Sequence, residues 1–138
     1  MTKDVVINVT GRQFDVGDVS VETAAEGNYY LKNGKHYVLY EERVEDSEDV
    51  IKNRVKFCDG YFEMVKNGAV SSALTFIPGQ KTESLYKTTA GGVLMETDTH
   101  DVKIVLEDSS IHVKVNYTLH INGQFISKCE VDFKVRNR

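Results

Sequence analysis

The chain of 138 residues contains no tryptophan, one proline and only two cysteines. Cys58 and Cys129 lie far apart and have no CxxC partner, which argues against a disulfide-stabilised fold, so we expect two reduced thiols. No apolar run approaches the roughly 20 residues that a membrane-spanning helix needs. No stretch repeats its apolar residues with a helical period over several turns. These absences favour a single all-β domain spanning residues 1–138.

An excess of basic charge is also absent. Lys and Arg together number 17 against 21 Asp and Glu, which gives a net charge of −4. Proteins that bind nucleic acid usually carry a basic patch, so we expect no nucleic-acid partner. The first residues lack the apolar segment of a signal peptide. We therefore expect a cytoplasmic protein without a membrane partner.

Turn signals, in contrast, occur along the whole chain. They are Asn33-Gly34, Asp59-Gly60, Asn67-Gly68, Pro78-Gly79, Gly91-Gly92 and Asn122-Gly123. Asn-Gly and Asp-Gly between alternating apolar runs are strong hairpin signals, because both residues tolerate positive φ. The sequence predicts a single antiparallel up-and-down meander of about 8–10 strands.

Side-chain alternation predicts the hairpin registers. A four-residue loop at residues 46–49 pairs Tyr40 with Val55 and gives three successive strands a common apolar face. The same register brings Lys52 opposite Arg43, which is a repulsive contact if it is direct.

The C-terminal half follows the same pattern. A three-residue loop at residues 122–124 places Phe125 on the apolar face with Cys129. In the strand before this hairpin, the inward-facing residues change from odd to even positions, and a bulge near His100-Asp101 explains the change. Long strands with one apolar face favour a closed β-barrel, because closure removes exposed edges. A β-sandwich is the alternative.

Five segments and one turn carry a family resemblance. The segments are YVLYEE (37–42), KNGAV (66–70), LYKTT (85–89), LMETDT (94–99) and VKVNYTL (113–119), and the turn is Asn122-Gly123. In this order and spacing they resemble the YwiB-like family of small bacterial proteins of unknown function. The resemblance implies a calycin-like barrel of the lipocalin and streptavidin type, and it implies no catalytic residue.

Three polar residues have the parity of the apolar face. Glu42, Asn53 and Lys66 fall on three successive predicted strands. Burying charged groups is costly unless they are paired, so an interior row of carboxylate, amide and ammonium needs a reason. Either the row lies at the barrel rim, where solvent hydrates its charged pair, or it binds the polar head group of a ligand.

Hydroxyl groups form a second interior set. Tyr40, Tyr86, Thr97 and Tyr117 have inward parity, with Tyr86 opposite Met95. A buried phenol needs a hydrogen-bond partner from protein, water or ligand. An inward threonine is explained equally well by a ligand-binding role or by ordinary cross-strand pairing that stabilises the sheet. The candidate ligand-binding residues are Tyr40, Glu42, Asn53, Lys66, Tyr86, Thr97 and Tyr117.

No motif for catalysis or metal binding is present in the sequence. His36, His100, His112 and His120 lack the spacing of metal ligands, and no phosphate-binding loop or GxSxG motif occurs. We expect no enzyme activity, no cofactor and no metal. The sequence favours a protein that binds a small apolar or amphipathic molecule inside its barrel. The alternative is a filled barrel that acts through its outer surface, in protein contacts or as a homodimer.

Overall fold

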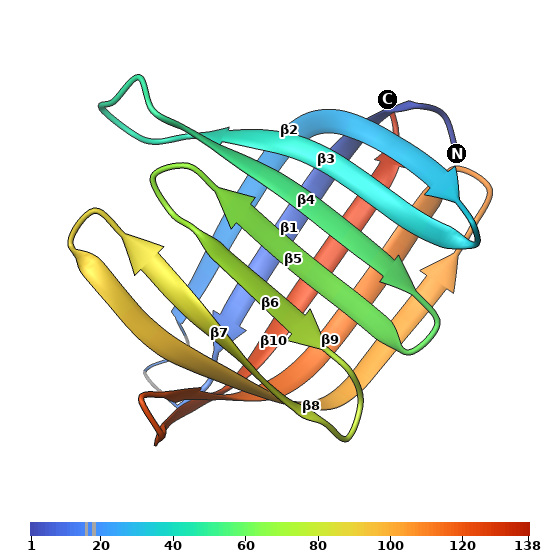
Figure 1. Ribbon diagram of the computed structural model, residues 1–138. Coiled ribbons are helices and arrows are strands. Elements are labelled where there is room, and N and C mark those ends of the chain that lie inside the picture. The colour runs from blue at the N-terminus through green and yellow to red at the C-terminus, as the bar shows by residue number, and fades with distance from the viewer. Residues whose placement is uncertain (16, 18) are drawn as a thin grey trace.

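The computed structural model describes residues 1–15, 17 and 19–138, and all of its regular elements are β-strands of one antiparallel sheet. The strands are β1 (Asp4–Gln13), β2 (Val19–Lys32), β3 (Lys35–Arg43), β4 (Val50–Cys58), β5 (Tyr61–Asn67), β6 (Ser72–Phe76), β7 (Lys81–Thr88), β8 (Gly91–Leu106), β9 (Ser110–Ile121) and β10 (Gln124–Asn137). Their order in the sheet is β6-β5-β4-β3-β2-β1-β10-β9-β8-β7 (Figure 1). The predicted meander is confirmed. Within the described part of the chain, no helix is long and apolar enough to cross a membrane.

The seam between β6 and β7 nearly closes the barrel without a regular ladder. One bridge joins Ser71 and Lys87, and the amide of each donates to the carbonyl oxygen of the other at 2.9 Å. The hydroxyls of Thr82 and Thr97 both donate to the carbonyl oxygen of Thr75. Side-chain hydroxyls therefore take the place of backbone pairing along much of this seam.

Two strands change partner along their length. β2 pairs with β1 through most of its course and with β3 only over residues 27–32. β8 pairs with β7 over residues 91–98 and with β9 over residues 95–106, and its register against β9 shifts between Thr99 and Asp101. This shift confirms the predicted bulge. The two strands join front and back layers into one nearly closed barrel, so the sandwich alternative is wrong (Figure 1).

Phenylalanines fill the end of the barrel that carries the Asp59-Gly60 turn. Phe57, Phe62, Phe76 and Phe133 are each 0% exposed. Their neighbouring ring centroids lie between 5.5 and 6.1 Å apart, mostly in tilted or edge-on pairs, which is a favourable arrangement for aromatic side chains. The fully buried aliphatic residues around them include Val5, Ile7, Val38, Val55, Val113, Val115 and Val135.

The register between β3 and β4 differs from the prediction by two residues. Tyr40 pairs with Asn53 instead of the predicted valine. A shift of two residues leaves every side chain on its predicted face, because the side-chain period of a strand is two. The observed register places Lys52 opposite Glu41 instead of Arg43, so an attractive pair replaces the predicted repulsive one.

The predicted interior position of Phe125 is wrong. The β9–β10 connection is a two-residue turn, and the extra residue forms a bulge between Phe125 and Ser127. Phe125 therefore pairs with His120 and is 54% exposed on the outer face. Beyond the bulge the predicted register holds, and Cys129 is buried against the core.

Gly27 lies where β2 leaves β1 and joins β3. A Cβ atom at this position would lie 2.3 Å from the carbonyl oxygen of Leu39 and 2.8 Å from Cδ1 of Ile7. A clash with backbone cannot be relieved by rotating a side chain. Only glycine fits this corner of the barrel.

We predict that Gly27→Ala lowers the free energy of unfolding by about 2–3 kcal/mol, because the added methyl group overpacks the corner. Gly11→Ala is the matched control on neighbouring β1, since a Cβ there has no atom within 4 Å. The control should change stability by less than about 1 kcal/mol. Urea unfolding measures both variants, and equal stabilities would contradict the role assigned to Gly27.

Candidate functional site

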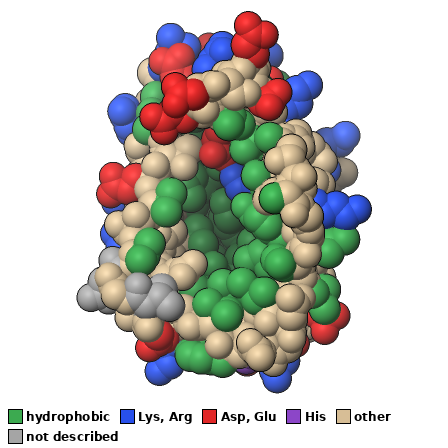
Figure 2. All heavy atoms as spheres, turned by 90° about the vertical axis from the view of Figure 1, so that its left-hand side faces the viewer, with side chains coloured by type: hydrophobic (Ala, Val, Ile, Leu, Met, Phe, Trp, Pro, Cys, Tyr) green, Lys and Arg blue, Asp and Glu red, His purple; other side chains and the backbone are tan. Residues whose placement is uncertain are grey.

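The barrel interior is hollow at the end opposite the phenylalanines. This end, here called the loop end, carries the connections at residues 44–49, 68–71, 89–90 and 122–123. Figure 2 views the loop end directly and shows a hollow whose walls are hydrophobic side chains, with acidic and basic side chains at its upper edge. Apolar walls with a few polar groups are the usual composition of a small-molecule site.

One side of the hollow is open because β3 separates from β2. The pairing of these strands ends at Gly27 and Tyr40, and β3 then continues to Arg43 paired only with β4. A groove of about 520 Å³ lies between the separated strands, lined by residues 22–26 and 41–43. Val19 and Val21 of β2 have inward parity here but remain 47% and 65% exposed.

Glu42, Asn53 and Lys66 meet inside the loop end. Nζ of Lys66 donates to Oε1 of Glu42 at 2.5 Å and to Oδ1 of Asn53 at 2.9 Å. Asn53 is 5% exposed, whereas the side chains of Glu42 and Lys66 are 22% and 26% exposed. The structure thus brings together the three residues of the predicted row, with the ammonium group in the centre.

The strand registers explain how this cluster forms. Asn53 pairs directly with Lys66, while Glu42 pairs with Ile51, two residues along β4. Same-face diagonal neighbours are about 7–8 Å apart, within reach of a long side chain. Nδ2 of Asn53 donates to the carbonyl oxygen of Ile51 at 3.3 Å, which turns Oδ1 toward the lysine.

Tyr40 adds a buried phenol to the cluster. It is 5% exposed and pairs with Asn53 across the strands. Burial, and then the negative charge of Glu42, raise the pKa of Tyr40. The phenol therefore stays protonated at neutral pH. Together these side chains offer a carboxylate, an ammonium, an amide and a neutral hydroxyl within one part of the interior.

Thr97 serves the barrel seam instead of the hollow. It is 1% exposed, its hydroxyl donates to the carbonyl oxygen of Thr75 at 3.0 Å, and its oxygen lies 2.8 Å from the hydroxyl of Thr82. These bonds satisfy the group without a ligand, so the structure gives Thr97 a role in closing the barrel.

The two remaining tyrosines lie apart from the cluster. The ring of Tyr117 packs 4.8 Å from that of Phe76, at the edge of the phenylalanine core, and burial raises the pKa of its phenol. Tyr86 is half-buried on β7 and pairs with Val93, not with Met95 as predicted. The reason is a two-residue β7–β8 turn, shorter than the predicted loop.

Other chemical groups of the chain are less suited to function. Within residues 1–15, 17 and 19–138, no group of three or more His, Cys, Asp or Glu could hold a metal ion. Both cysteines are free, and burial raises the pKa of the Cys129 thiol. A buried thiol with a raised pKa is a poor nucleophile at neutral pH.

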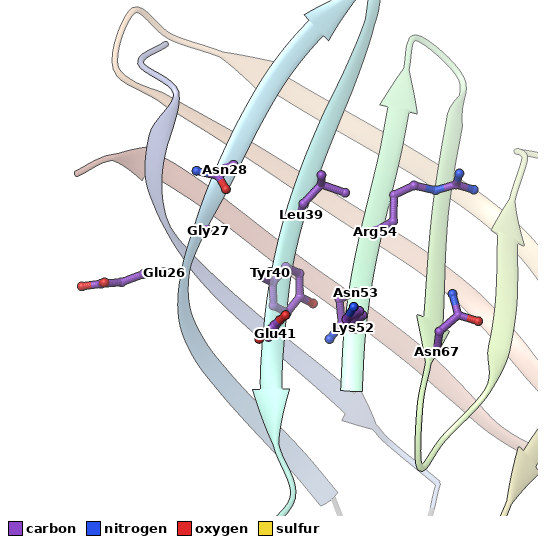
Figure 3. A pocket seen from close by; sticks show the side chains of 10 residues that line it. All are labelled: Glu26, Gly27, Asn28, Leu39, Tyr40, Glu41, Lys52, Asn53, Arg54 and Asn67. Atoms are coloured by element: carbon purple, nitrogen blue, oxygen red, sulfur yellow. The ribbon is translucent and has the colours of Figure 1, made fainter. Parts of the chain in front are cut away.

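A second groove, of about 490 Å³, lies on the outer face of β2–β5 (Figure 3). Two of the four charged side chains that line it form ion pairs: Arg54 with Glu63 at 3.0 Å, and Glu26 with Arg138 at 3.3 Å. The other two, Glu41 and Lys52, lie opposite each other on β3 and β4. In Figure 3 the labelled side chains spread in several directions. The groove lacks the convergent polar groups of a small-molecule site.

Sequence reasoning missed the separation of β2 from β3. The one local signal is Gly27, because a glycine inside a strand pattern often marks a sharp bend at a barrel corner. That signal indicates a bend without indicating which neighbouring strand moves away.

A double-mutant cycle with Glu42→Gln and Lys66→Met measures how strongly the interior pair is coupled. We predict a coupling energy of about 1–2 kcal/mol, between the values for exposed and fully buried pairs. The outer pair Arg54–Glu63, whose arginine is 50% exposed, is the matched control and should couple by less than about 0.5 kcal/mol. Denaturant unfolding provides the free energies. Equal coupling in the two cycles would show that the interior pair is an ordinary surface contact.

Comparison with known proteins agrees with this architecture. Residues 7–133 match the family model described as a domain of unknown function, DUF1934. The uncharacterized β-barrel protein YwiB of Bacillus subtilis is 27% identical over 104 residues, covering 75% of this chain and 72% of that protein. The crystal structure of the B. subtilis protein superposes with a TM-score of 0.84 at 22% identity, over 99% of this chain and 92% of that one. The chain therefore belongs to the DUF1934 family of YwiB-like β-barrel proteins.

Proposed function

We propose that this protein is a non-enzymatic binding module that holds a small amphipathic molecule at the loop end of its barrel. The polar end of the molecule lies at Lys66, Glu42 and Asn53, and its apolar part lies against the walls of the hollow. The observation that supports this proposal most is the Glu42–Lys66 pair, which has the parity of the inner face and is only partly exposed, and whose glutamate lines the groove that opens beside the hollow.

The energetics of the pair favour a role in binding. Replacing a buried ion pair with well-packed apolar residues is often neutral or stabilising, so the fold itself has little need of this one. An ammonium group has three protons to donate, and two are used on Glu42 and Asn53. The third is suited to an oxygen of a ligand, either a hydroxyl or an acidic group.

Apolar side chains of the barrel interior supply the remaining contacts. Val9, Ala25, Met64 and Leu74 are partly buried and pack against the core. A molecule lying along them gains affinity from apolar burial, at about 25 cal/mol for each Å² removed from water. The proposed ligand is therefore partly apolar with one polar end.

Titration with the fluorescent sulfonate 1-anilinonaphthalene-8-sulfonate (ANS) tests this proposal. We expect saturable binding, weakened about tenfold by Lys66→Met, which corresponds to 1.4 kcal/mol. Glu42→Gln should strengthen binding, because it removes the carboxylate that competes with the sulfonate for Lys66. Lys52→Met is the matched control on neighbouring β4, since Lys52 is exposed and lies on the outer face. The proposal fails if the three variants bind ANS alike, or if the unmodified protein does not bind it.

A second candidate function is self-association through the outer face. Tyr30 and Leu39 are 41% and 39% exposed on the outer face of the β2–β3 hairpin, beside a groove of about 630 Å³. Exposed apolar patches commonly mark interaction sites. Sedimentation velocity should then show a homodimer that Leu39→Lys disrupts and Leu85→Lys, on β7, leaves intact. A monomer at all concentrations would rule this candidate out.

A further inference from the structure

β2 has a free edge beside the hollow. Over residues 19–26 it pairs with β1 on one side. On its other side no strand among the described residues pairs with it, because β3 joins β2 only from Gly27 onward. A strand edge of this kind presents a row of N–H and C=O groups that another strand can pair with.

The usual protection of an edge is weak here. Residues 19–26 contain no lysine and no proline, which commonly block edge pairing. Val19 and Val21 are instead largely exposed along this edge. An added strand would cover these two valines while it pairs with the backbone.

The charges around the edge indicate which partner fits. Glu22, Glu26, Glu41 and Glu42 line the groove between β2 and β3, and Arg43 is the one basic residue among those lining it. The adjoining loop at residues 44–49 adds four more acidic residues. Glu26 and Glu42 form ion pairs with Arg138 and Lys66. Within the described part of the chain, Glu22 and Glu41 form no ion pair, although Lys52 lies opposite Glu41 across the strands. These two acids are therefore the ones best placed to meet a partner.

A second copy of the chain does not satisfy these charges. Pairing of two β2 edges would bring Glu22 and Glu26 of both copies onto one small area, and like charges on neighbouring strands are destabilising. A basic segment avoids this repulsion.

We propose that the free edge of β2 at residues 19–26 binds an extended basic peptide segment as an additional β-strand. Backbone hydrogen bonds give this mode of binding its affinity, and alternate side chains give it specificity. Basic side chains on one face of the segment meet Glu22 and Glu41, and apolar side chains on the other face cover Val19 and Val21. The inference is independent of a ligand in the hollow.

A fluorescein-labelled peptide of alternating lysine and valine, ten residues long and blocked at both ends, is the probe. Fluorescence anisotropy should show saturable binding, weakened about tenfold or more when Glu22→Lys and Glu41→Lys are combined, because both charge contacts become repulsive. Glu107→Lys in the β8–β9 turn makes the same change of charge elsewhere and should alter the affinity less than about twofold.

A second peptide, with proline at each valine position, separates strand pairing from simple charge attraction. Proline has no N–H to donate to a ladder, so this peptide should bind at least about tenfold more weakly. Hydrogen exchange should slow at residues 19–26 when the first peptide binds. Equal binding of the two peptides, or an unchanged affinity in the double variant, would overturn the proposal. So would exchange at residues 19–26 that slows with protein concentration alone, because that result identifies a second copy as the partner.

Discussion

The packing of four phenylalanines at one end of the barrel determines how the rest of the interior is used. Phe57, Phe62, Phe76 and Phe133 are fully buried and fill that end with interlocking rings. A barrel of this size is just wide enough for side chains to fill. At the loop end the inward positions carry smaller or polar side chains, among them Thr23, Ala25 and Asn53, and the interior is hollow there (Figure 2). The residues that stabilise the barrel and the proposed binding site thus lie at opposite ends of one structure.

The hollow also explains how an ion pair is tolerated inside the barrel. Complete burial of Glu42 and Lys66 would carry a large desolvation penalty, but both side chains keep about a quarter of their surface exposed. Asn53 accepts a hydrogen bond from Lys66, and β3 leaves β2 just before Glu42, so the pair lies beside the opening. The proposed ligand site and the proposed peptide edge therefore depend on one feature, the separation of β3 from β2 beyond Gly27.

Alternation of side chains was enough to predict the barrel and the inward positions of Glu42, Asn53 and Lys66, because a two-residue register error leaves each side chain on its face. The exact partners were not predictable, because they depend on turn conformations. Asn122 and Gly123 have φ values of 50° and 81°, which suit a two-residue turn, and the extra residue was displaced into a bulge that exposes Phe125. The free edge of β2 was not predictable either, since it depends on where β3 lies in three dimensions.

The most direct test of the central claim is to locate a bound probe on the protein. Two-dimensional ¹H–¹⁵N NMR spectra recorded during titration with ANS report the backbone amides near the bound molecule. The largest shift changes are expected at residues 41–42, at residues 51–53 and at Lys66, with small changes at Tyr30 and Leu39 on the outer face of the hairpin. Changes concentrated at Tyr30 and Leu39, with the amides around Lys66 unmoved, would contradict a binding site inside the barrel.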